Sequence, residues 1–399
     1  MPLPGSPRHR SCGTTTLADM QSMLSILLVL LANTTAGYLV PNPPGKYNVT
    51  LTTGPLIDYT RNDPLAATPT PRALMLSVFQ PATCASTVSV SYMPNKTAEY
   101  QGPFLQKQFN ISANLTPLFL EARLPVCLDD PSGCSPVDDS PILLFSPGYG
   151  IPRLYYSVLA SAIASEGFIV ITIDHPKDAN IITYPDGHAV YNNGPSSPTS
   201  DEFTRYVYPR AADASFIIDQ LSNASAIAEL LPQRGPRQFP TDRVAMLGHS
   251  LGGSAAVIAA GQDPRLRGAI DWDGTLFGSL PPSGLSQPVL YMSEANATDP
   301  SWLAAWPQLK GPKLWVTVAN TTHESFTDAL TLLQAAGQNT AALAGLLGTI
   351  APAEMVRILA AYTTAWMNGA FTGKVVGPLL QGQEPGRFPE VSTVMKSNF

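Results

Sequence analysis

The stretch RVAMLGHSLGGSAAVIAA, residues 243–260, decides how this chain folds. Residues 243–247 are a mostly apolar run of the kind that forms a buried strand, and residues 251–260 predict a helix of small and apolar residues. Between them, GHSLG at 248–252 matches the pattern G-x-S-x-G in a strand–turn–helix context. Such a turn exposes a serine hydroxyl at the edge of a sheet, so we expect Ser250 to be a nucleophile.

The same alternation of strands and helices extends on both sides of this stretch. Strands are predicted at 141–145, 168–173, 266–271, 289–292 and 314–318, and helices at 153–165, 201–221, 299–309 and about 325–372, with a long irregular segment at 176–200. Uniformly apolar strands that alternate with helices indicate a mostly parallel sheet covered on both faces. We therefore expect an α/β fold with a single catalytic domain over 73–399.

Two parts of the chain depart from this alternation. Residues 73–93 hold two β-branched runs, which predict an N-terminal β annex, and the C-terminal part is predicted to be helical. Residues 37–72 are rich in Pro and Thr, and we expect an extended N-terminal arm that runs over the surface.

The composition excludes some classes of protein. The chain has 399 residues, of which 44% are hydrophobic and only 13% are charged, so it is not disordered as a whole. The formal net charge is −6, with 23 Lys and Arg and no basic cluster. Because nucleic-acid binding needs a basic surface, we expect no nucleic acid among the partners.

The first residues are typical of an export signal. Met23 to Ala32 form an uncharged apolar run, with Arg8 and Arg10 before it and small residues after it. This pattern predicts a signal peptide over 1–36 and a secreted protein. An uncleaved membrane anchor is the alternative, although the run is shorter than the roughly 20 residues that span a bilayer.

Sequons and cysteines fit an oxidising, extracellular environment. Cys127 and Cys134 flank a short Asp/Pro/Gly loop, and we expect them to form a disulfide, with Cys84 left over unless it pairs instead. Seven N-x-S/T sequons lie beyond the predicted cleavage site, which favours a glycoprotein. They are Asn48, Asn95, Asn110, Asn114, Asn223, Asn296 and Asn320.

A serine nucleophile needs a base, and the chain offers one candidate. Enzymes with this turn place the acid and then the histidine after the serine, and His323 is the only histidine downstream of Ser250. His249 precedes the serine directly, so it points elsewhere and is expected to pack or to hydrogen-bond locally. We therefore predict His323 as the general base.

The acid that would orient His323 is less strictly determined. Asp273 follows a predicted strand and is our first choice, because a carboxylate at that junction can turn toward the imidazole. Glu294, which ends the next strand, and Asp271, which lies within its strand, remain as alternatives.

The negative charge that develops on a tetrahedral intermediate needs two backbone donors. One is expected to be the N–H group of Leu251, directly after the nucleophile. The other is expected from the loop SPGYG at 146–150, and we choose the N–H group of Tyr149.

Taken together, these motifs resemble the platelet-activating-factor acetylhydrolase family, in its secreted, group VII phospholipase A2-like form and its fungal relatives. The resemblance covers roughly 73–395 and is carried by FSPGYG with the following RLYY, TIDHP, GHSLGG, Arg265, Arg267 and Asp273, MSE at 292–294, and H-x-x-F-x-D from His323. It implies an α/β-hydrolase fold, Ser250 as nucleophile, Asp273 as acid, His323 as base and an oxyanion hole from Tyr149 and Leu251. The implied reaction is calcium-independent hydrolysis of a short sn-2 acyl group from ether or oxidised phospholipids.

Other functions are compatible with the same residues. A cutinase-like polyester esterase, a feruloyl esterase or a lactone esterase would use the same three side chains, whereas a non-enzymatic binding module would usually have lost one of them. We expect a small lipid or ester as the substrate, a transient membrane or lipoprotein surface as a partner, and neither a cofactor nor a metal.

Overall fold

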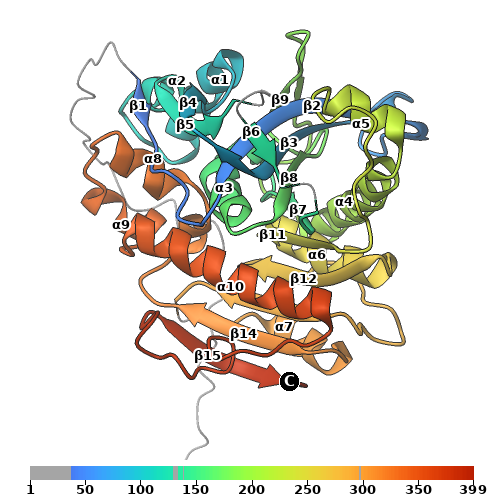
Figure 1. Ribbon diagram of the computed structural model, residues 1–399. Coiled ribbons are helices and arrows are strands. Elements are labelled where there is room, and N and C mark those ends of the chain that lie inside the picture. The colour runs from blue at the N-terminus through green and yellow to red at the C-terminus, as the bar shows by residue number, and fades with distance from the viewer. Residues whose placement is uncertain (1–36, 129–133, 138, 296–297) are drawn as a thin grey trace, which may run out of the picture.

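The computed structural model describes residues 37–128, 134–137, 139–295 and 298–399. The predicted signal peptide therefore lies outside the described residues. Within them, one large sheet runs through the molecule with helices on both sides (Figure 1). The strand order is β1-β5-β2-β3-β8-β7-β11-β12-β13-β14-β15, with β4 paired to β5 and β6 to β3.

The strands of this sheet are β1 (Tyr38–Leu39), β2 (Asn48–Asn62), β3 (Pro71–Cys84), β4 (Thr87–Ser91), β5 (Ala122–Cys127), β6 (Cys134–Pro136), β7 (Ile142–Ser146), β8 (Ile169–Asp174), β11 (Val244–His249), β12 (Leu266–Trp272), β13 (Val289–Ser293), β14 (Lys313–Val318) and β15 (Val391–Ser397). The strands β9 (Ile181–Thr183) and β10 (Ala189–Tyr191) form a separate hairpin within the segment predicted to be irregular.

The helices are α1 (Asn95–Gln108), α2 (Thr116–Leu120), α3 (Ser157–Ser165), α4 (Ser200–Leu221), α5 (Ala224–Leu230), α6 (Leu251–Gln262), α7 (Pro300–Ala305), α8 (Ala329–Ala335), α9 (Ala344–Leu347) and α10 (Pro352–Thr372). Short 3₁₀ turns include Arg153–Tyr156 and His323–Phe326.

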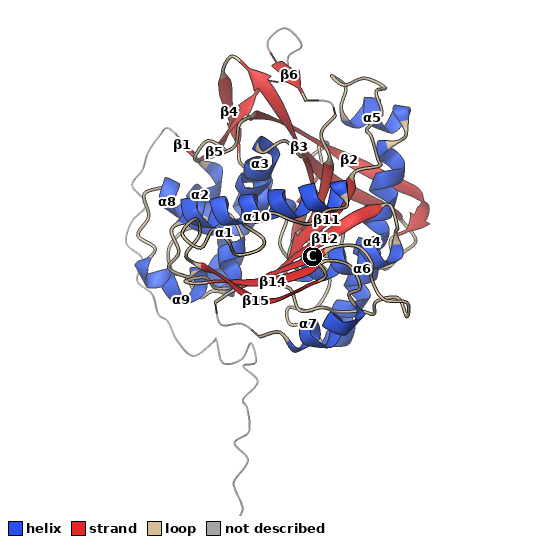
Figure 2. Ribbon diagram, turned by 60° about the horizontal axis from the view of Figure 1, so that its bottom comes forward, coloured by secondary structure: helices blue, strands red, loops and turns tan. Residues whose placement is uncertain are grey.

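The central strands confirm the predicted α/β fold. Strands β8, β7, β11, β12, β13 and β14 pair in parallel, and only the flanking β3 and β15 run antiparallel to them. Because a parallel connection needs a crossover, each of these strands is followed by a helix or long segment that returns over a face of the sheet. Figure 2 shows the strands enclosed between these helices.

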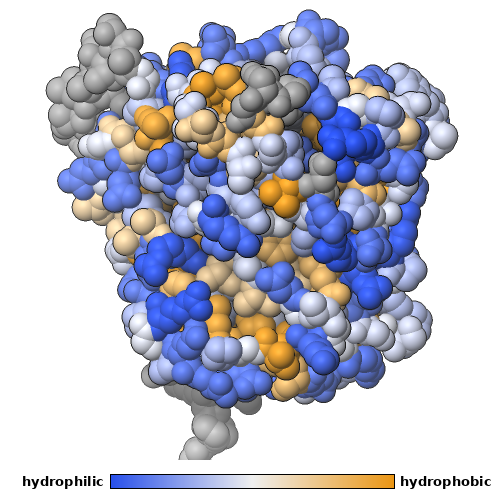
Figure 3. All heavy atoms as spheres, in the orientation of Figure 1, coloured by the Kyte–Doolittle hydropathy of each residue, from blue (hydrophilic) through white to orange (hydrophobic). Residues whose placement is uncertain are grey.

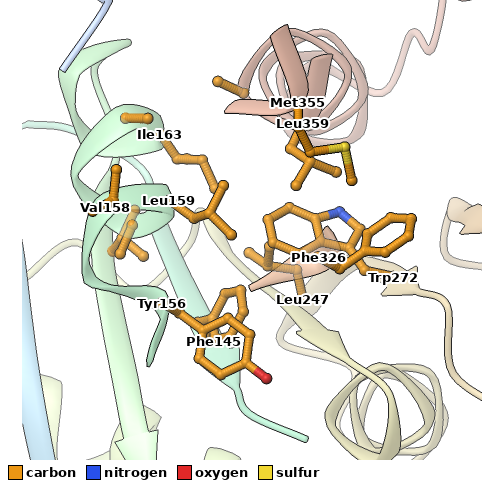
Figure 4. Close-up of a cluster of buried hydrophobic side chains, with 14 of the residues drawn as sticks. Phe145, Tyr156, Val158, Leu159, Ile163, Leu247, Trp272, Phe326, Met355 and Leu359 are labelled. Carbon is orange, nitrogen blue, oxygen red and sulfur yellow. The ribbon is translucent and has the colours of Figure 1, made fainter. Parts of the chain in front are cut away.

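Alternate side chains of the central strands form two separate cores. Leu143 and Phe145 of β7 face one side, where α3, α8 and α10 pack, whereas Ile142 and Leu144 face the other, where α4 and α6 pack. This split follows from the two-residue period of a strand. Figure 4 shows part of the first core, in which the ring centroids of Phe145 and Trp272 lie 5.4 Å apart.

The N-terminal region differs from its prediction. The segment 37–72 is not a surface arm, because β2 lies between β5 and β3 within the sheet and pairs antiparallel with β3 along most of its length. The predicted β annex is likewise continuous with the main sheet through β3 and β8. A Thr-rich sequence is compatible with a strand as well as with an extended arm. The pairing with β3 is what makes this segment a strand of the sheet.

The predicted disulfide is wrong. The bond joins Cys84 to Cys127, with their Cα atoms 6.1 Å apart, and not Cys127 to Cys134. Cys84 and Cys127 end strands β3 and β5, which flank β2, whereas Cys134 lies in β6 and is in register with Cys84. Closeness in the sequence therefore did not indicate which sulfur atoms meet.

The surface carries the predicted sequons. The asparagines of six of them are exposed, and Asn296 lies outside the described residues. In the view of Figure 3 most of the surface is polar, with apolar residues in small groups.

Candidate active site

The turn between β11 and α6 holds Ser250 in a strained backbone conformation. Its φ is 56° and its ψ is −126°, a region that residues other than glycine rarely adopt. The surrounding backbone secures this geometry, because the Ser250 N–H group donates to the Trp272 carbonyl at 2.8 Å and the Ser250 carbonyl accepts from Gly253 at 2.9 Å. The conformation is that of a nucleophile elbow.

Two glycines make this turn possible by allowing close backbone contacts. A Cβ atom on Gly248 would lie 2.3 Å from the carbonyl of Gly252, and one on Gly252 would lie 1.9 Å from the carbonyl oxygen of Ser146. Both distances are too short for any side chain. The G-x-S-x-G pattern is thus explained by packing of the turn against β7.

The predicted acid and base lie within hydrogen-bond distance. The Nδ1 atom of His323 lies 2.6 Å from Oδ2 of Asp273. The other carboxylate oxygen, Oδ1, accepts from the backbone N–H group of Glu294 at 2.7 Å. Because a carboxylate only accepts, the proton of the neutral imidazole resides on Nδ1 and its Nε2 atom is left to accept a proton.

Both residues lie next to the serine turn. Asp273 directly follows Trp272, whose carbonyl binds the Ser250 N–H group. The ring centroid of His323 lies 4.5 Å from that of His249, which directly precedes Ser250. The structure therefore brings the three predicted residues together at the carboxyl ends of β11, β12 and β14.

The charges around His323 favour its protonated form. Burial alone would lower the pKa of this imidazole, but the Asp273 carboxylate, aided by Glu324 and Glu294, raises the pKa to about 9. Burial also raises the pKa of Glu324 and of Glu294. About 43% of the His323 side chain is exposed, so solvent moderates these interactions.

The alternative acids occupy other places. Asp271 is buried, accepts from the backbone of Gly274 at 2.9 Å and from the Trp302 indole at 3.2 Å, and has its pKa raised by burial. Glu294 contacts Asp273 through its backbone. Neither carboxylate makes a hydrogen bond to the His323 imidazole among the described contacts.

His249 is neutral and bonded locally, as expected. It is fully buried, and burial lowers its pKa well below the usual value. Its Nδ1 atom lies 2.9 Å from the hydroxyl of Tyr156. It therefore helps to pack the ring of His323 rather than accepting a proton from Ser250.

The loop after β7 lies against the serine. A Cβ atom on Gly148 would lie 3.5 Å from the Cβ atom of Ser250. The Gly148 N–H group donates to the Tyr156 hydroxyl at 3.1 Å, and the next amide along the loop is that of Tyr149. Leu251 is the first residue of α6, where backbone N–H groups have no partner within the helix.

Beside Tyr149, a cavity of about 380 Å³ opens between α1, α2, α8 and α9. Its wall is mainly apolar and includes six aromatic residues, and its one charged group is Glu324, the neighbour of His323. The aromatic residues are Tyr100, Phe104, Phe109, Phe119, Tyr149 and Tyr155.

Two residues of the sequence motifs, Asp328 and Arg265, contact parts of the fold other than Ser250, Asp273 and His323. Asp328 accepts from the backbone of Val158 at 2.8 Å and Leu159 at 3.1 Å, and so caps the start of α3. Arg265 forms salt bridges with Asp263 and Asp219 near the surface.

The sequence analysis assigned no role to Arg210 of α4 or to Tyr156 of the 3₁₀ turn Arg153–Tyr156, and both contact the loop after β7. Arg210 is an arginine inside a helix, and no spacing pattern connects it to the loop. The one sequence signal that could have drawn attention to Arg210 is that only 13% of the residues in this chain are charged.

Comparison with known proteins places the chain among ester hydrolases. A family model described as platelet-activating factor acetylhydrolase, isoform II, matches residues 36–202. A probable 1-alkyl-2-acetylglycerophosphocholine esterase from Arthroderma benhamiae is 29% identical over 92% of this chain and 98% of its own length. A platelet-activating factor acetylhydrolase from Bos taurus is 24% identical over 47% of this chain and 48% of its own length.

A solved structure is similar over most of the fold. The ferulic acid esterase from Streptomyces cinnamoneus matches with a TM-score of 0.73 and 26% identity, and the match covers 90% of this chain and 100% of that one. That enzyme is named for a different class of ester from the sequence relatives.

Proposed function

We propose that the chain is a member of the platelet-activating-factor acetylhydrolase family, to whose model and relatives it is similar, and a serine esterase that removes a short sn-2 acyl group, such as acetyl, from 1-alkyl-2-acetylglycerophosphocholine-like phospholipids. The observation that carries this proposal is the hydrogen bond between Asp273 and His323 beside the strained Ser250 turn, in a chain similar to an esterase of this kind over nearly its full length.

The proposed reaction uses Ser250 as the nucleophile, His323 as the base and two backbone N–H groups as oxyanion donors. Nε2 of His323 takes the proton of the Ser250 hydroxyl while Oγ attacks the ester carbonyl, and the N–H groups of Tyr149 and Leu251 bind the resulting oxyanion. Collapse of this intermediate passes the proton from His323 to the departing alcohol and leaves an acyl-serine. Water, deprotonated by His323, then releases the carboxylic acid and restores Ser250.

The cavity beside Tyr149 supports a lipid-like substrate. Its apolar wall suits an alkyl chain, because burying each methylene stabilises a complex by about 0.8 kcal/mol. The cavity is much larger than an acetyl group requires. We therefore place the alkyl part of the alcohol in it, with the short acyl group at Ser250.

We also propose that the mature protein is secreted and glycosylated. The apolar run from Met23 to Ala32 and the exposed asparagines of the described sequons support this. The surface of the chain would then meet its lipid substrate outside the cell, at a membrane or lipoprotein surface.

A second candidate function is hydrolysis of an aromatic acyl ester. The aromatic wall of the cavity and the similarity to a ferulic acid esterase favour it, because aromatic rings pack well against one another. In this case the cavity would hold the acyl group and not the alcohol.

The two candidates are separated by a substrate panel. Purified mature protein is assayed with 1-alkyl-2-acetyl-, 2-hexanoyl- and 2-palmitoylglycerophosphocholine, methyl ferulate and a polyester film, with Ser250→Ala as the blank. We expect turnover to fall steeply from acetyl to palmitoyl. Faster turnover of methyl ferulate would replace the first proposal with the second, and equal turnover of the palmitoyl lipid would contradict a short-acyl preference.

A further inference from the structure

Buried side chains hold the loop Ser146–Gly148, which precedes the proposed oxyanion donor. Arg210, in the middle of α4, is only 1% exposed and faces this loop. Its Nη1 atom donates to Ser146 Oγ at 3.0 Å and to the carbonyl of Pro147, and its Nη2 atom donates to the carbonyl of Gly148 at 3.3 Å. One guanidinium group thus contacts three consecutive residues.

A buried carboxylate holds Arg210 in place. Asp178 accepts from Nε of Arg210 at 2.7 Å and from Nη2 at 2.6 Å, a bidentate pair that fixes the plane of the guanidinium. Because an unpaired buried charge is costly, neither group can leave the other without strong destabilisation. Arg210 is therefore a rigid support for the loop.

The Ser146 hydroxyl is oriented from a second side. Oγ of Ser146 lies 3.0 Å from Nε2 of His175, and Nδ1 of His175 lies 2.8 Å from Oδ2 of Asp213. Burial lowers the pKa of His175 to about 4, so the ring is neutral. It donates to Asp213 through Nδ1 and accepts a hydrogen bond from the Ser146 hydroxyl at Nε2, which leaves the lone pairs of Ser146 Oγ for Arg210.

The Gly148 carbonyl and the Tyr149 N–H group belong to the same peptide unit. No cis peptide occurs among the described residues, so the two groups point in opposite directions within one plane. A hydrogen bond that fixes the carbonyl therefore fixes the direction of the N–H group. A cationic donor on the carbonyl oxygen also withdraws electron density from the amide, and this strengthens the N–H group as a donor.

The preceding peptide is held from the other side. The N–H group of Gly148 donates to the hydroxyl of Tyr156 at 3.1 Å, and this hydroxyl lies 2.9 Å from Nδ1 of His249. Tyr156 is fully buried, and its ring centroid lies 4.7 Å from that of Phe145 in β7 (Figure 4). The loop is thus held by the Arg210 guanidinium at the carbonyl groups of Pro147 and Gly148, and by the Tyr156 hydroxyl at the N–H group of Gly148.

We propose that Arg210, with Tyr156 on the opposite side, is a positioning residue of the oxyanion hole, which aims and polarises the N–H group of Tyr149. This inference rests on the proposed function only in that the reaction passes through a tetrahedral oxyanion. The nature of the lipid does not enter it.

The test uses Arg210→Lys and a small soluble ester, 4-nitrophenyl acetate, so that it is independent of the lipid proposal. Active sites are counted by titration with an organophosphonate. Removing an oxyanion donor typically lowers kcat about 10²–10³-fold, so a misdirected one should lower kcat per titrated site roughly 10–100-fold with KM changed less than about threefold.

A trifluoromethyl ketone supplies the readout that a purely structural role would not change. It forms a tetrahedral adduct with Ser250 and needs the oxyanion hole as the transition state does. We expect its Ki to rise in Arg210→Lys by the same factor by which kcat/KM falls. An unchanged Ki, or an unchanged kcat per titrated site, would overturn the proposal.

Arg72→Lys is the matched control. Arg72 is also a buried arginine with a bidentate carboxylate, Asp213, at 2.7 Å from both Nε and Nη2. It makes no described contact with the loop itself and is linked to Ser146 only indirectly, through Asp213 and His175. We expect Arg72→Lys to lose as much thermal stability as Arg210→Lys, while the ratio of the Ki of the ketone to the KM of the ester stays unchanged. A rise of this ratio equal to that of Arg210→Lys would assign the effect to general loosening.

Should Arg210→Lys not fold, Tyr156→Phe decides the question. This change removes only the oxygen that accepts from Gly148. We expect a smaller effect of the same kind, about 3–10-fold in kcat with a parallel rise in the Ki of the ketone. A Tyr156→Phe variant with the kcat and the ketone Ki of the wild type would contradict the proposal.

Discussion

His323 and Asp273 are joined by a hydrogen bond of 2.6 Å between Nδ1 and Oδ2, although 50 positions separate them in the chain. The bond forms because β12 and β14 end at the same edge of the sheet with β13 between them. The backbone N–H group of Glu294, at the end of β13, binds the second oxygen of the Asp273 carboxylate. The intervening strand therefore orients the acid toward the base.

Asp273→Asn should abolish most activity. An amide in this place favours the wrong tautomer of His323, and the equivalent change in a serine protease lowers kcat by about 10⁴-fold. Steady-state kinetics with a soluble ester measure the effect. Glu294→Gln is the matched control, because it keeps the backbone donor to Asp273, and it should lower kcat less than about tenfold. A larger loss in Glu294→Gln than in Asp273→Asn would assign the acid to Glu294.

The pH profile should report the raised pKa of His323. Only the neutral imidazole accepts the serine proton, so kcat/KM should rise with pH, with an inflection above the usual value of about 6.5 and toward the pKa of about 9. Without the Asp273 carboxylate, burial lowers this pKa, so the residual activity of Asp273→Asn should titrate at lower pH. An inflection that stays in place in this variant would show that another group titrates.

The same pKa shift links stability to pH. Because the folded-state pKa of His323 is raised, its interaction with Asp273 stabilises the fold fully below about 6.5 and this contribution is lost as pH rises toward about 9. Urea denaturation of wild type at pH 6 and pH 9.5 measures the change. Asp273→Asn should show a smaller loss of stability between these two pH values.

Ser250→Ala should lower turnover more than a thousandfold while the protein remains folded, since the loss of a serine nucleophile typically costs more than this. A fluorophosphonate should label wild type at Ser250, as located by peptide mass spectrometry. Ser254→Ala serves as the control, because Ser254 lies one turn further along α6 and donates to the Phe277 carbonyl. Labelling of any other serine would contradict the assignment.

The disulfide should appear as a Cys84–Cys127 linkage in a non-reduced peptide map. Its removal in a Cys84→Ala/Cys127→Ala variant should lower the free energy of unfolding by about 2–4 kcal/mol, because the unfolded chain gains freedom. Urea denaturation of the variant measures this loss. A linkage of Cys127 with Cys134 in the map would contradict the structure.

Some features followed from the sequence because they depend on local patterns. The continuous apolar runs of β7, β8 and β11 predicted buried parallel strands, and the structure confirms them. The strand–Gly-His-Ser-Leu-Gly–helix order predicted the strained turn at Ser250. The choice of His323 and the preference for Asp273 depended on chain order and strand ends, which a regular α/β alternation makes informative.

Other features were decided only in three dimensions. The partner of Cys127, the place of β2 inside the sheet and the contact of Arg210 with the Ser146–Gly148 loop all join segments whose separation in the chain carries no signal. The sequence by itself determined the central parallel strands, the elbow and the candidate nucleophile, because apolar periodicity and glycine sterics act within a few residues. The tertiary structure decided which distant side chains meet, because strand order and packing, and not spacing along the chain, set those distances.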